Sequence, residues 1–180
     1  MARYVAFLRG MNLGNRRLKN TELVAEFERL GFAEVATFRA SGNVVFDVAG
    51  RAGKAALTKK VEAGLGDGLG YEVPVFLRSV AEVAAIAAHE PFPVKAVAAS
   101  KGKLQVSLLG KEPGAAAVKQ ALALATDDDR LAIEGRELYW LPSGGISESE
   151  LDLKALDKAL GKGTMRTMGT VEQIAAKYCG

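Results

Sequence analysis

One nine-residue segment, residues 9–17, carries the side chains best suited to chemistry in this sequence. It reads Arg-Gly-Met-Asn-Leu-Gly-Asn-Arg-Arg and follows the apolar run of residues 4–8. Glycine lets the backbone approach a bound group closely, arginine supplies a fixed positive charge, and asparagine supplies directed hydrogen bonds. The segment predicts an anion site, although its spacing matches neither a phosphate-binding P-loop nor a dinucleotide motif. Its candidate binding residues are Arg9, Gly10, Asn12, Gly14 and Asn15.

Two other polar segments carry similar side chains. Ser41, Gly42 and Asn43 interrupt two apolar runs, which is typical of a turn or a bulge. Thr164, Arg166 and Thr170 precede the last helical pattern of the chain. Hydroxyl groups and an arginine at a helix start can either cap the helix or hold an anion there.

The first half of the chain must position the first two segments. Apolar spacing predicts the order strand, helix, strand, strand, helix, strand, which is the ferredoxin-like arrangement. In that arrangement the first and third strands are antiparallel neighbours, so we expect Arg9 and Asn43 to lie at the same end of the sheet. The expected elements are residues 3–8, 20–31, 34–40, 44–48, 52–65 and 71–78. We interpret the glycine-rich residues 64–70 as the exit of the second helix.

The second half repeats most of this pattern without detectable sequence identity. An alanine-rich helix over about 80–89 leads into it, and Ser147 and Glu150 form a possible capping box for its second helix. The order is strand, helix, strand, strand, helix, then a C-terminal helix at about 170–178, so the last strand is missing. We expect an α+β fold of two ferredoxin-like (α/β plait) halves, with antiparallel sheets and helices packed on one face. The expected boundaries are a first half at 1–80, a connecting helix and linker at 81–100, and an incomplete second half at 101–180.

Composition narrows the function classes. The net charge of +3 is only mildly basic and by itself does not indicate nucleic-acid binding. The single histidine and the single cysteine, at position 179, give weak support for a catalytic triad and no zinc spacing. The acidic run Asp127, Asp128 and Asp129 matches no calcium loop and is interpreted as a solvated turn. We expect neither a metal nor a cofactor, and we expect a cytoplasmic protein without a signal peptide or membrane span.

With these motifs in view, the chain resembles the bacterial family named domain of unknown function 1697. Its members carry R-G-[IV]-N-x-G-[GN] after a first strand and S-G-N-[VL]-[VI]-F, matched here by residues 9–15 and 41–46. They close with T-x-R-N-W-x-T, matched in part by Thr164, Arg166 and Thr170. Thr167 and Met168 stand where the family usually has Asn and Trp. The resemblance implies two ferredoxin-like halves and one polar pocket lined by three parts of the chain, but it implies no reaction.

Three functions remain open at this stage. The first is binding of a small phosphorylated or carboxylated ligand, with Arg9 and Arg166 neutralising its charge and the amides and hydroxyls orienting it. These residues offer electrostatic stabilisation but no clear general base, so whether the protein is an enzyme stays open. The second is nucleic-acid binding through basic loops, which lacks the paired aromatic residues expected on such a sheet. The third is a regulatory interaction module.

Overall fold

The computed structural model describes residues 1–10, 18–39 and 42–180, and the chain divides into two units. The first unit consists of Met1–Ala84 together with Ile174–Gly180, and the second consists of Ala85–Gln173. This division differs from the boundaries expected from the sequence, because the C-terminal segment belongs with the first unit. One contact within that unit is an edge-on packing of the rings of Phe38 and Tyr178, whose centroids lie 6.5 Å apart.

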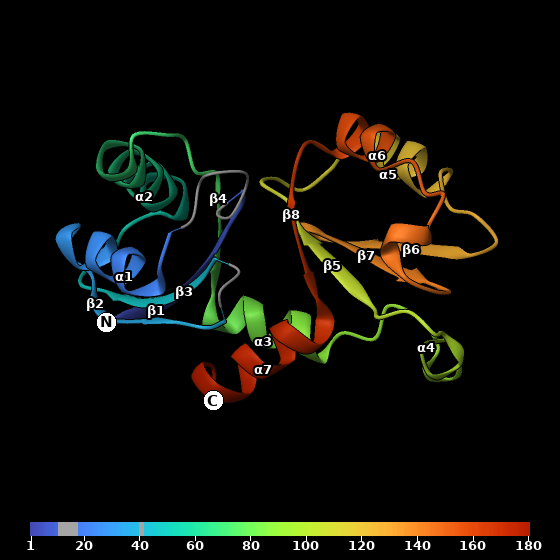
Figure 1. Cartoon of the computed structure of the whole chain (residues 1–180), viewed down its shortest axis with the longest axis horizontal. Coiled ribbons are helices and arrows are strands. Elements are labelled where there is room, and N and C mark those ends of the chain that lie inside the picture. Colours follow the sequence, from blue (N-terminus) through green and yellow to red (C-terminus); the bar gives the residue numbers. More distant parts are fainter. Residues whose placement is uncertain (11–17, 40–41) are drawn as a thin grey trace. The chain divides into compact units, whose positions relative to one another are not determined.

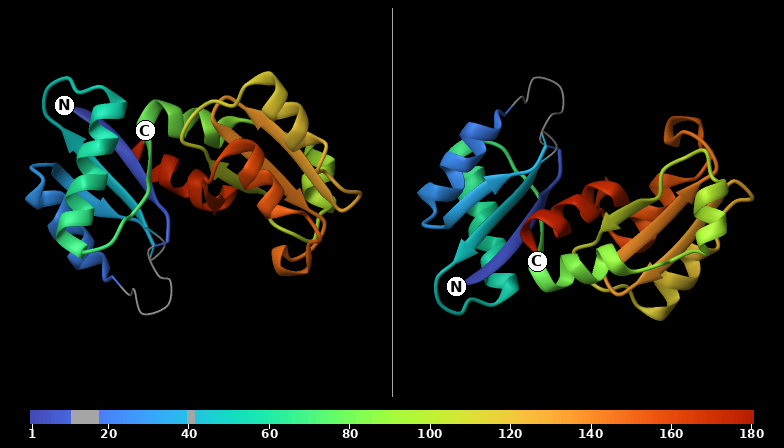
Figure 2. Two further views of the ribbon diagram at one scale, coloured as in Figure 1. Left: turned by 90° about the horizontal axis from the view of Figure 1, so that it is seen from above. Right: turned by 90° about the horizontal axis from the view of Figure 1, so that it is seen from below.

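The first unit contains the predicted βαββαβ order. Its elements are β1 (Ala2–Leu8), α1 (Asn20–Arg29), β2 (Ala33–Thr37), β3 (Asn43–Val48), α2 (Lys54–Leu69) and β4 (Val75–Ser79), after which α3 (Val80–Ala88) begins. The strands form one antiparallel sheet in the order β2-β3-β1-β4. Figure 1 shows α1 and α2 together on one face of this sheet, and in Figure 2 the blue β1 lies beside the cyan β3.

Strand alternation explains why both faces of the first sheet are buried. Successive side chains of a strand point to opposite faces. Ala6, Leu8, Val44 and Phe46 face α1 and α2 and belong to a core with Leu23, Phe27, Leu57, Val61 and Leu65. The alternate residues Val5, Phe7, Val45 and Phe76 lie on the second face and are also buried.

Glycines let α1 and α2 pack closely. Residues 64–70 do not form the exit of a shorter helix, as the sequence suggested: α2 continues to Leu69, and Gly70 ends it in the left-handed conformation. A Cβ at Gly64 would lie 2.3 Å from Leu30 Cδ2, and one at Gly68 would lie 2.0 Å from Glu26 Oε2. The glycines are therefore explained by contact with α1, a tertiary effect that overrides their low helix propensity.

The second unit repeats the same topology. After α4 (Val94–Ala99) come β5 (Gln105–Leu108), α5 (Ala115–Leu122), β6 (Asp129–Glu134), β7 (Glu137–Pro142), the 3₁₀ helix η1 (Ile146–Glu148), α6 (Leu153–Leu160) and β8 (Thr164–Thr167), followed by α7 (Met168–Tyr178). The sheet order is β6-β7-β5-β8, and α5 and α6 lie on one face of it (Figure 1). Leu138, Trp140, Leu151, Leu156 and Leu160 form the core of this layer.

Two expectations for the second unit were wrong. The unit is not incomplete, because residues 164–167 are a strand that pairs with β5, with Val106 opposite Arg166. A four-residue strand is too short to show a clear alternation in sequence, so the apolar pattern does not reveal it. The expected capping box at Ser147 also does not form: Asp152 caps α6, and its Oδ1 accepts a hydrogen bond from Ala155 N at 3.0 Å. The α+β class with two ferredoxin-like halves is confirmed.

Candidate functional site

Arg9 lies at the end of the first sheet where β1 leaves it. Leu8 N donates to Gly42 O at 2.8 Å, and Arg9 N donates to Pro74 O at 3.0 Å. The backbone at Leu8 and Arg9 is thus held between the entrance to β3 and the entrance to β4. This juxtaposition of Arg9 with the glycine of the second motif is the one that the topology predicted.

Positive φ angles shape the backbone on both sides of this contact. Gly10 has φ 72° and Gly42 has φ 76°, values that glycine adopts without strain. The backbone turns sharply directly after β1 and directly before β3. These two glycines therefore have a geometric role, whatever else binds near them.

Asn43 closes the connection between β2 and β3 through two hydrogen bonds to Phe38. It is fully buried and lies opposite Phe7 in the sheet. Its Nδ2 donates to Phe38 O at 2.9 Å, while Phe38 N donates to Asn43 O at 3.0 Å. The side chain and the backbone of Asn43 thus close the connection together, and this positions the residues at the sheet end.

Arg39 and Asn20 are neighbours of this site that sequence reasoning missed. Arg39 has φ 59°, and its guanidinium carbon lies 5.5 Å from the centre of the Phe38 ring. Asn20 Nδ2 donates to Arg39 O at 3.3 Å, which ties the start of α1 to the β2–β3 connection. An arginine in the left-handed conformation has no sequence signature. The only sequence signal that could have identified Arg39 is the predicted order of elements, which places it next to the second motif.

Four of the predicted residues cannot be placed in this geometry. Asn12, Gly14, Asn15 and Ser41 lie outside the described residues. The described part of the site consists of the Arg9–Gly10 and Gly42–Asn43 pairs, together with Arg39 and Asn20. It brings two guanidinium-bearing residues to one end of one sheet.

The third motif lies in the second unit, on β8 and at the start of α7. Arg166 is 9% exposed, and its Nη1 donates to Thr164 Oγ1 at 2.8 Å and to Met165 O at 2.9 Å. Burial lowers the pKa of Arg166 to about 10. Thr164 therefore holds the guanidinium in position along its own strand.

Thr167 caps α7. Its Oγ1 accepts a hydrogen bond from Thr170 N at 3.3 Å, and the two threonine hydroxyl oxygens lie 2.9 Å apart. A threonine is thus a working cap at the position where the family usually has asparagine, since both side chains can accept the N–H of the first helical turn. Met168 is buried.

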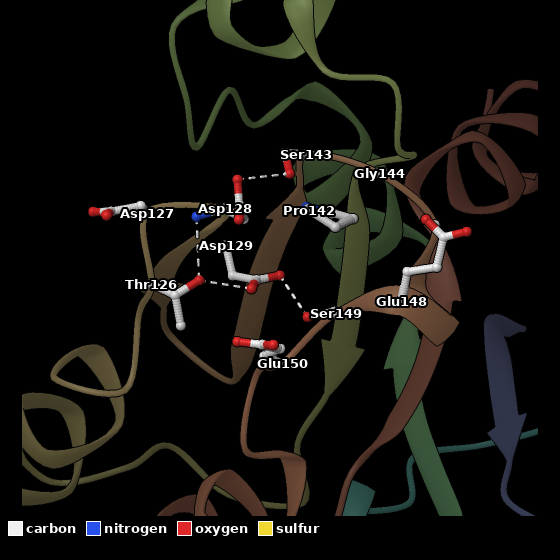
Figure 3. A pocket seen from close by; sticks show the side chains of 11 residues that line it. Thr126, Asp127, Asp128, Asp129, Pro142, Ser143, Gly144, Glu148, Ser149 and Glu150 are labelled. Carbon is white, nitrogen blue, oxygen red and sulfur yellow. Dashed lines mark hydrogen bonds between the residues drawn. The ribbon is translucent and has the colours of Figure 1, made fainter.

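The second unit also contains an acidic cavity of about 470 Å³, shown in Figure 3. Asp129, Glu148 and Glu150 are among its lining residues. Within the part of the chain that the structure describes, no group of three or more His, Cys, Asp or Glu side chains is arranged to hold a metal ion. The acidic run at 127–129 is only partly the solvated turn that was expected, because Asp129 is buried whereas Asp127 and Asp128 are exposed.

The histidine and the cysteine are explained by packing. The rings of His89 and Tyr139 lie 5.0 Å apart, and burial raises the pKa of the Cys179 thiol. Neither residue lies in the motifs discussed above. Among the described helices, none combines the length and the apolar character that crossing a bilayer requires.

The class of protein is defined by this geometry: an α+β protein built from two ferredoxin-like units, with a polar site at one end of the first sheet. The sequence matches the model of the family described as protein of unknown function (DUF1697) over residues 1–139, and the chain belongs to that family. The match includes the first two motifs and ends before the third.

A solved structure has the same fold. It is that of the conserved bacterial protein SP0830 from Streptococcus pneumoniae, which is similar with a TM-score of 0.73 and 20% sequence identity. The similarity covers 98% of this chain and 97% of that one. Because the identity is this low, the likeness establishes the fold alone. A comparison with curated proteins finds no match.

Proposed function

We propose that the protein binds a small anionic ligand, phosphorylated or carboxylated, at the sheet end formed by Arg9, Gly42 and Arg39. The observation that carries the proposal is the pair of hydrogen bonds from Leu8 N to Gly42 O and from Arg9 N to Pro74 O. They hold Arg9, the residue that follows β1, beside the β2–β3 connection, which carries Arg39.

The chemistry of these side chains favours an anion. Guanidinium groups present planar N–H donors that match the geometry of carboxylate and phosphate oxygens. The sharp glycine turns at Gly10 and Gly42 permit a close backbone approach to a bound group. Binding, rather than a reaction, is the function that these groups support.

The first test is a thermal-shift panel on the full chain at low and moderate salt. The panel contains phosphate, nucleotides, nucleotide sugars, small carboxylates and a short RNA. A ligand at about 100 times its dissociation constant stabilises the protein by roughly 2.7 kcal/mol. A shift from a small anion that persists at moderate salt supports the proposal. A shift from RNA alone, and only at low salt, replaces it with nucleic-acid binding, because contacts to phosphate backbones weaken steeply with salt.

The second test uses Arg9→Ala. Losing a hydrogen bond to a charged group costs about 1.5–3 kcal/mol, so we expect at least a tenfold loss of affinity for the ligand found in the panel. Arg51→Ala is the matched control, because Arg51 is an exposed arginine in the same unit but outside the site. Unchanged affinity in Arg9→Ala, with an intact fold, rules out this site.

A further inference from the structure

The edge of the second sheet at β6 presents a regular strand. β6 stands at one end of the order β6-β7-β5-β8, and its register with β7 is unbroken from Asp129 to Glu134. The corresponding edge strand of the first sheet, β2, differs, because its pairing with β3 shifts register between Ala33 and Ala36. Irregularities of that kind blunt a sheet edge, whereas a regular edge can accept another strand. In the described part of the chain, β6 is paired with β7 alone (Figure 1).

The backbone groups of β6 that face away from β7 belong to alternate residues. Ser143, directly after β7, donates its N–H to Asp128 O at 2.8 Å, so the even-numbered residues of this segment bond toward β7. Asp129 bonds on the other side: its N–H donates to Thr126 O at 3.2 Å, and its C=O accepts from Thr126 N at 3.1 Å. The outward groups of Asp129 are therefore already used within the chain. Alternation places the outward groups of the next two odd-numbered residues at the open edge.

Those two residues are Leu131 and Ile133. Their side chains pack against the core of the second unit, together with residues of α5 and α6, yet both remain only half-buried. The apolar face of the sheet thus continues up to its edge. A strand added beside β6 would find backbone donors and acceptors at both residues and would extend the same apolar face.

A second copy of β6, running antiparallel, satisfies both residues in one register. It places Ile133 of the copy opposite Leu131, and Leu131 of the copy opposite Ile133, about a two-fold axis at Ala132. Sliding the copy by two residues in one direction sets Leu131 opposite Gly135, which lies in the hairpin turn. Sliding it in the other direction sets Ile133 opposite Asp129, whose outward groups are already bonded. The backbone therefore selects the register centred on Ala132.

The same register sets opposite charges against each other. Arg130 faces Glu134 of the copy, and Glu134 faces Arg130 of the copy. Both side chains are exposed, and both lie on the same face of the sheet. These are positions without backbone hydrogen bonds between the copies, where opposing Cα atoms are about 4.5 Å apart and side chains interact most closely. Within its own hairpin Glu134 lies opposite Glu137, and like charges so placed are destabilising, which an arginine of the copy would offset.

We infer that β6 is a self-association edge, through which two copies of this chain join antiparallel about Ala132 into one continuous sheet. The occupant is a second copy because the backbone groups and the charges of the strand are self-complementary about the same residue. The inference goes beyond the proposed function and does not depend on its ligand. The interface is small and its ion pairs are exposed, so the association is weak and is weakened further by salt.

Sedimentation equilibrium of the full chain at low salt is the first test. We expect a dimer that grows between about 10 μM and about 1 mM protein, the range in which a small interface associates. Two-fold symmetry gives each dimer two ion pairs, so Arg130→Glu and Glu134→Arg should each weaken it at least tenfold. Arg51→Glu and Glu72→Arg change the charge equally at exposed positions of the first unit and should leave the dimer unchanged. A chain that stays monomeric, or equal losses in the controls, overturns the inference.

Combining the charge variants separates specific pairing from a general effect of charge. The double variant Arg130→Glu with Glu134→Arg keeps the net charge of the unaltered protein and again faces opposite charges, so we expect it to regain the dimer. An equimolar mixture of the two single variants should form a heterodimer for the same reason. Circular dichroism checks that every variant is folded. Failure of both combinations to dimerise would show that these residues do not face each other.

Cross-linking tests the register itself. Ala132 lies opposite Ala132 of the copy, and a Cα separation of about 4.5 Å is within the range that a disulfide spans. In a Cys179→Ser background, we expect Ala132→Cys to form a disulfide-linked dimer under mild oxidation. Glu134→Cys is the control, because four residues along a strand separate the two introduced thiols by about 13 Å. A cross-link at position 134 and none at 132 would contradict the proposed pairing.

Discussion

Trp140 Nε1 donates a hydrogen bond to Asp129 Oδ1 at 2.9 Å, in the interior of the second unit. The same carboxylate accepts from Ser149 Oγ at 2.7 Å and from Thr126 Oγ1 at 2.7 Å (Figure 3). A single buried carboxylate therefore connects the start of β6, the middle of β7 and the segment after η1. This explains why one acid of the acidic run is buried.

Removing this carboxylate should destabilise the second unit. Asp129→Ala leaves the buried indole N–H without its acceptor, and an unsatisfied buried donor costs about 1–3 kcal/mol. Trp140 is the only tryptophan of the chain, so urea unfolding followed by its fluorescence reports on this unit. Asp127→Ala is the control, because Asp127 is exposed, and we expect it to leave the midpoint unchanged. Equal midpoints for Asp129→Ala and the unaltered protein would show that the network contributes nothing.

Acid should unfold the protein through two carboxylates. Burial acts to raise the pKa of Asp129, but the hydrogen bonds from Thr126, Ser149 and Trp140 outweigh it and lower the pKa overall. The hydrogen bond from Arg3, whose Nε lies 2.7 Å from Asp47 Oδ1, lowers the pKa of Asp47.

A lowered folded-state pKa contributes stability above the unfolded-state value of about 3.9, and this contribution is lost as the pH falls through the folded-state value. We therefore expect the free energy of unfolding to be independent of these groups from pH 7 to about 5 and to fall below about pH 4. Because the Arg3 side chain is 38% exposed, Asp47 should contribute less than about 1 kcal/mol. Urea titrations of Asp47→Asn and Asp129→Asn across this range check the assignment, since each variant should show a shallower acid slope.

The contact between α1 and α2 predicts opposite effects for two glycines of one helix. Gly66→Ala should stabilise the protein by about 0.5–1 kcal/mol, because alanine favours the helix and the nearest atom to its Cβ lies 4.0 Å away. Gly64→Ala should destabilise it by about 1–3 kcal/mol, because its Cβ would lie 2.3 Å from Leu30 Cδ2 and overpacking costs that much. Thermal unfolding followed by circular dichroism measures both. Stabilisation by both changes would mean that Leu30 moves aside at no cost.

Two substitutions near the start of α6 test whether the helix is capped by Ser147, as the sequence suggested, or by Asp152, as in the structure. Asp152→Ala removes the acceptor of Ala155 N and should cost about 1 kcal/mol, a fall of roughly 2–4 °C in Tm for a chain of this size. Ser147→Ala should have no effect, since η1 and not α6 contains Ser147. A lower Tm for Ser147→Ala than for Asp152→Ala would instead support the expected capping box at Ser147.

The sequence by itself determined the order of elements in the first unit and the meeting of its two motifs. The helical and alternating apolar patterns are strong there, and the ferredoxin-like connection makes β1 and β3 central neighbours. The sequence alone thus places Arg9 and the Gly42–Asn43 motif at one sheet end, because strand adjacency follows from topology.

Tertiary structure alone decided the remaining features. A strand as short as β8 carries too few residues for a periodic signal and forms because β5 offers a partner. The cap of α6 is Asp152 because Ser147 belongs to the 3₁₀ helix η1 and α6 begins only at Leu153. The burial of Arg166 on β8, opposite Val106, became visible only in the structure, since side-chain burial and strand register are properties of the folded chain and local sequence does not encode them.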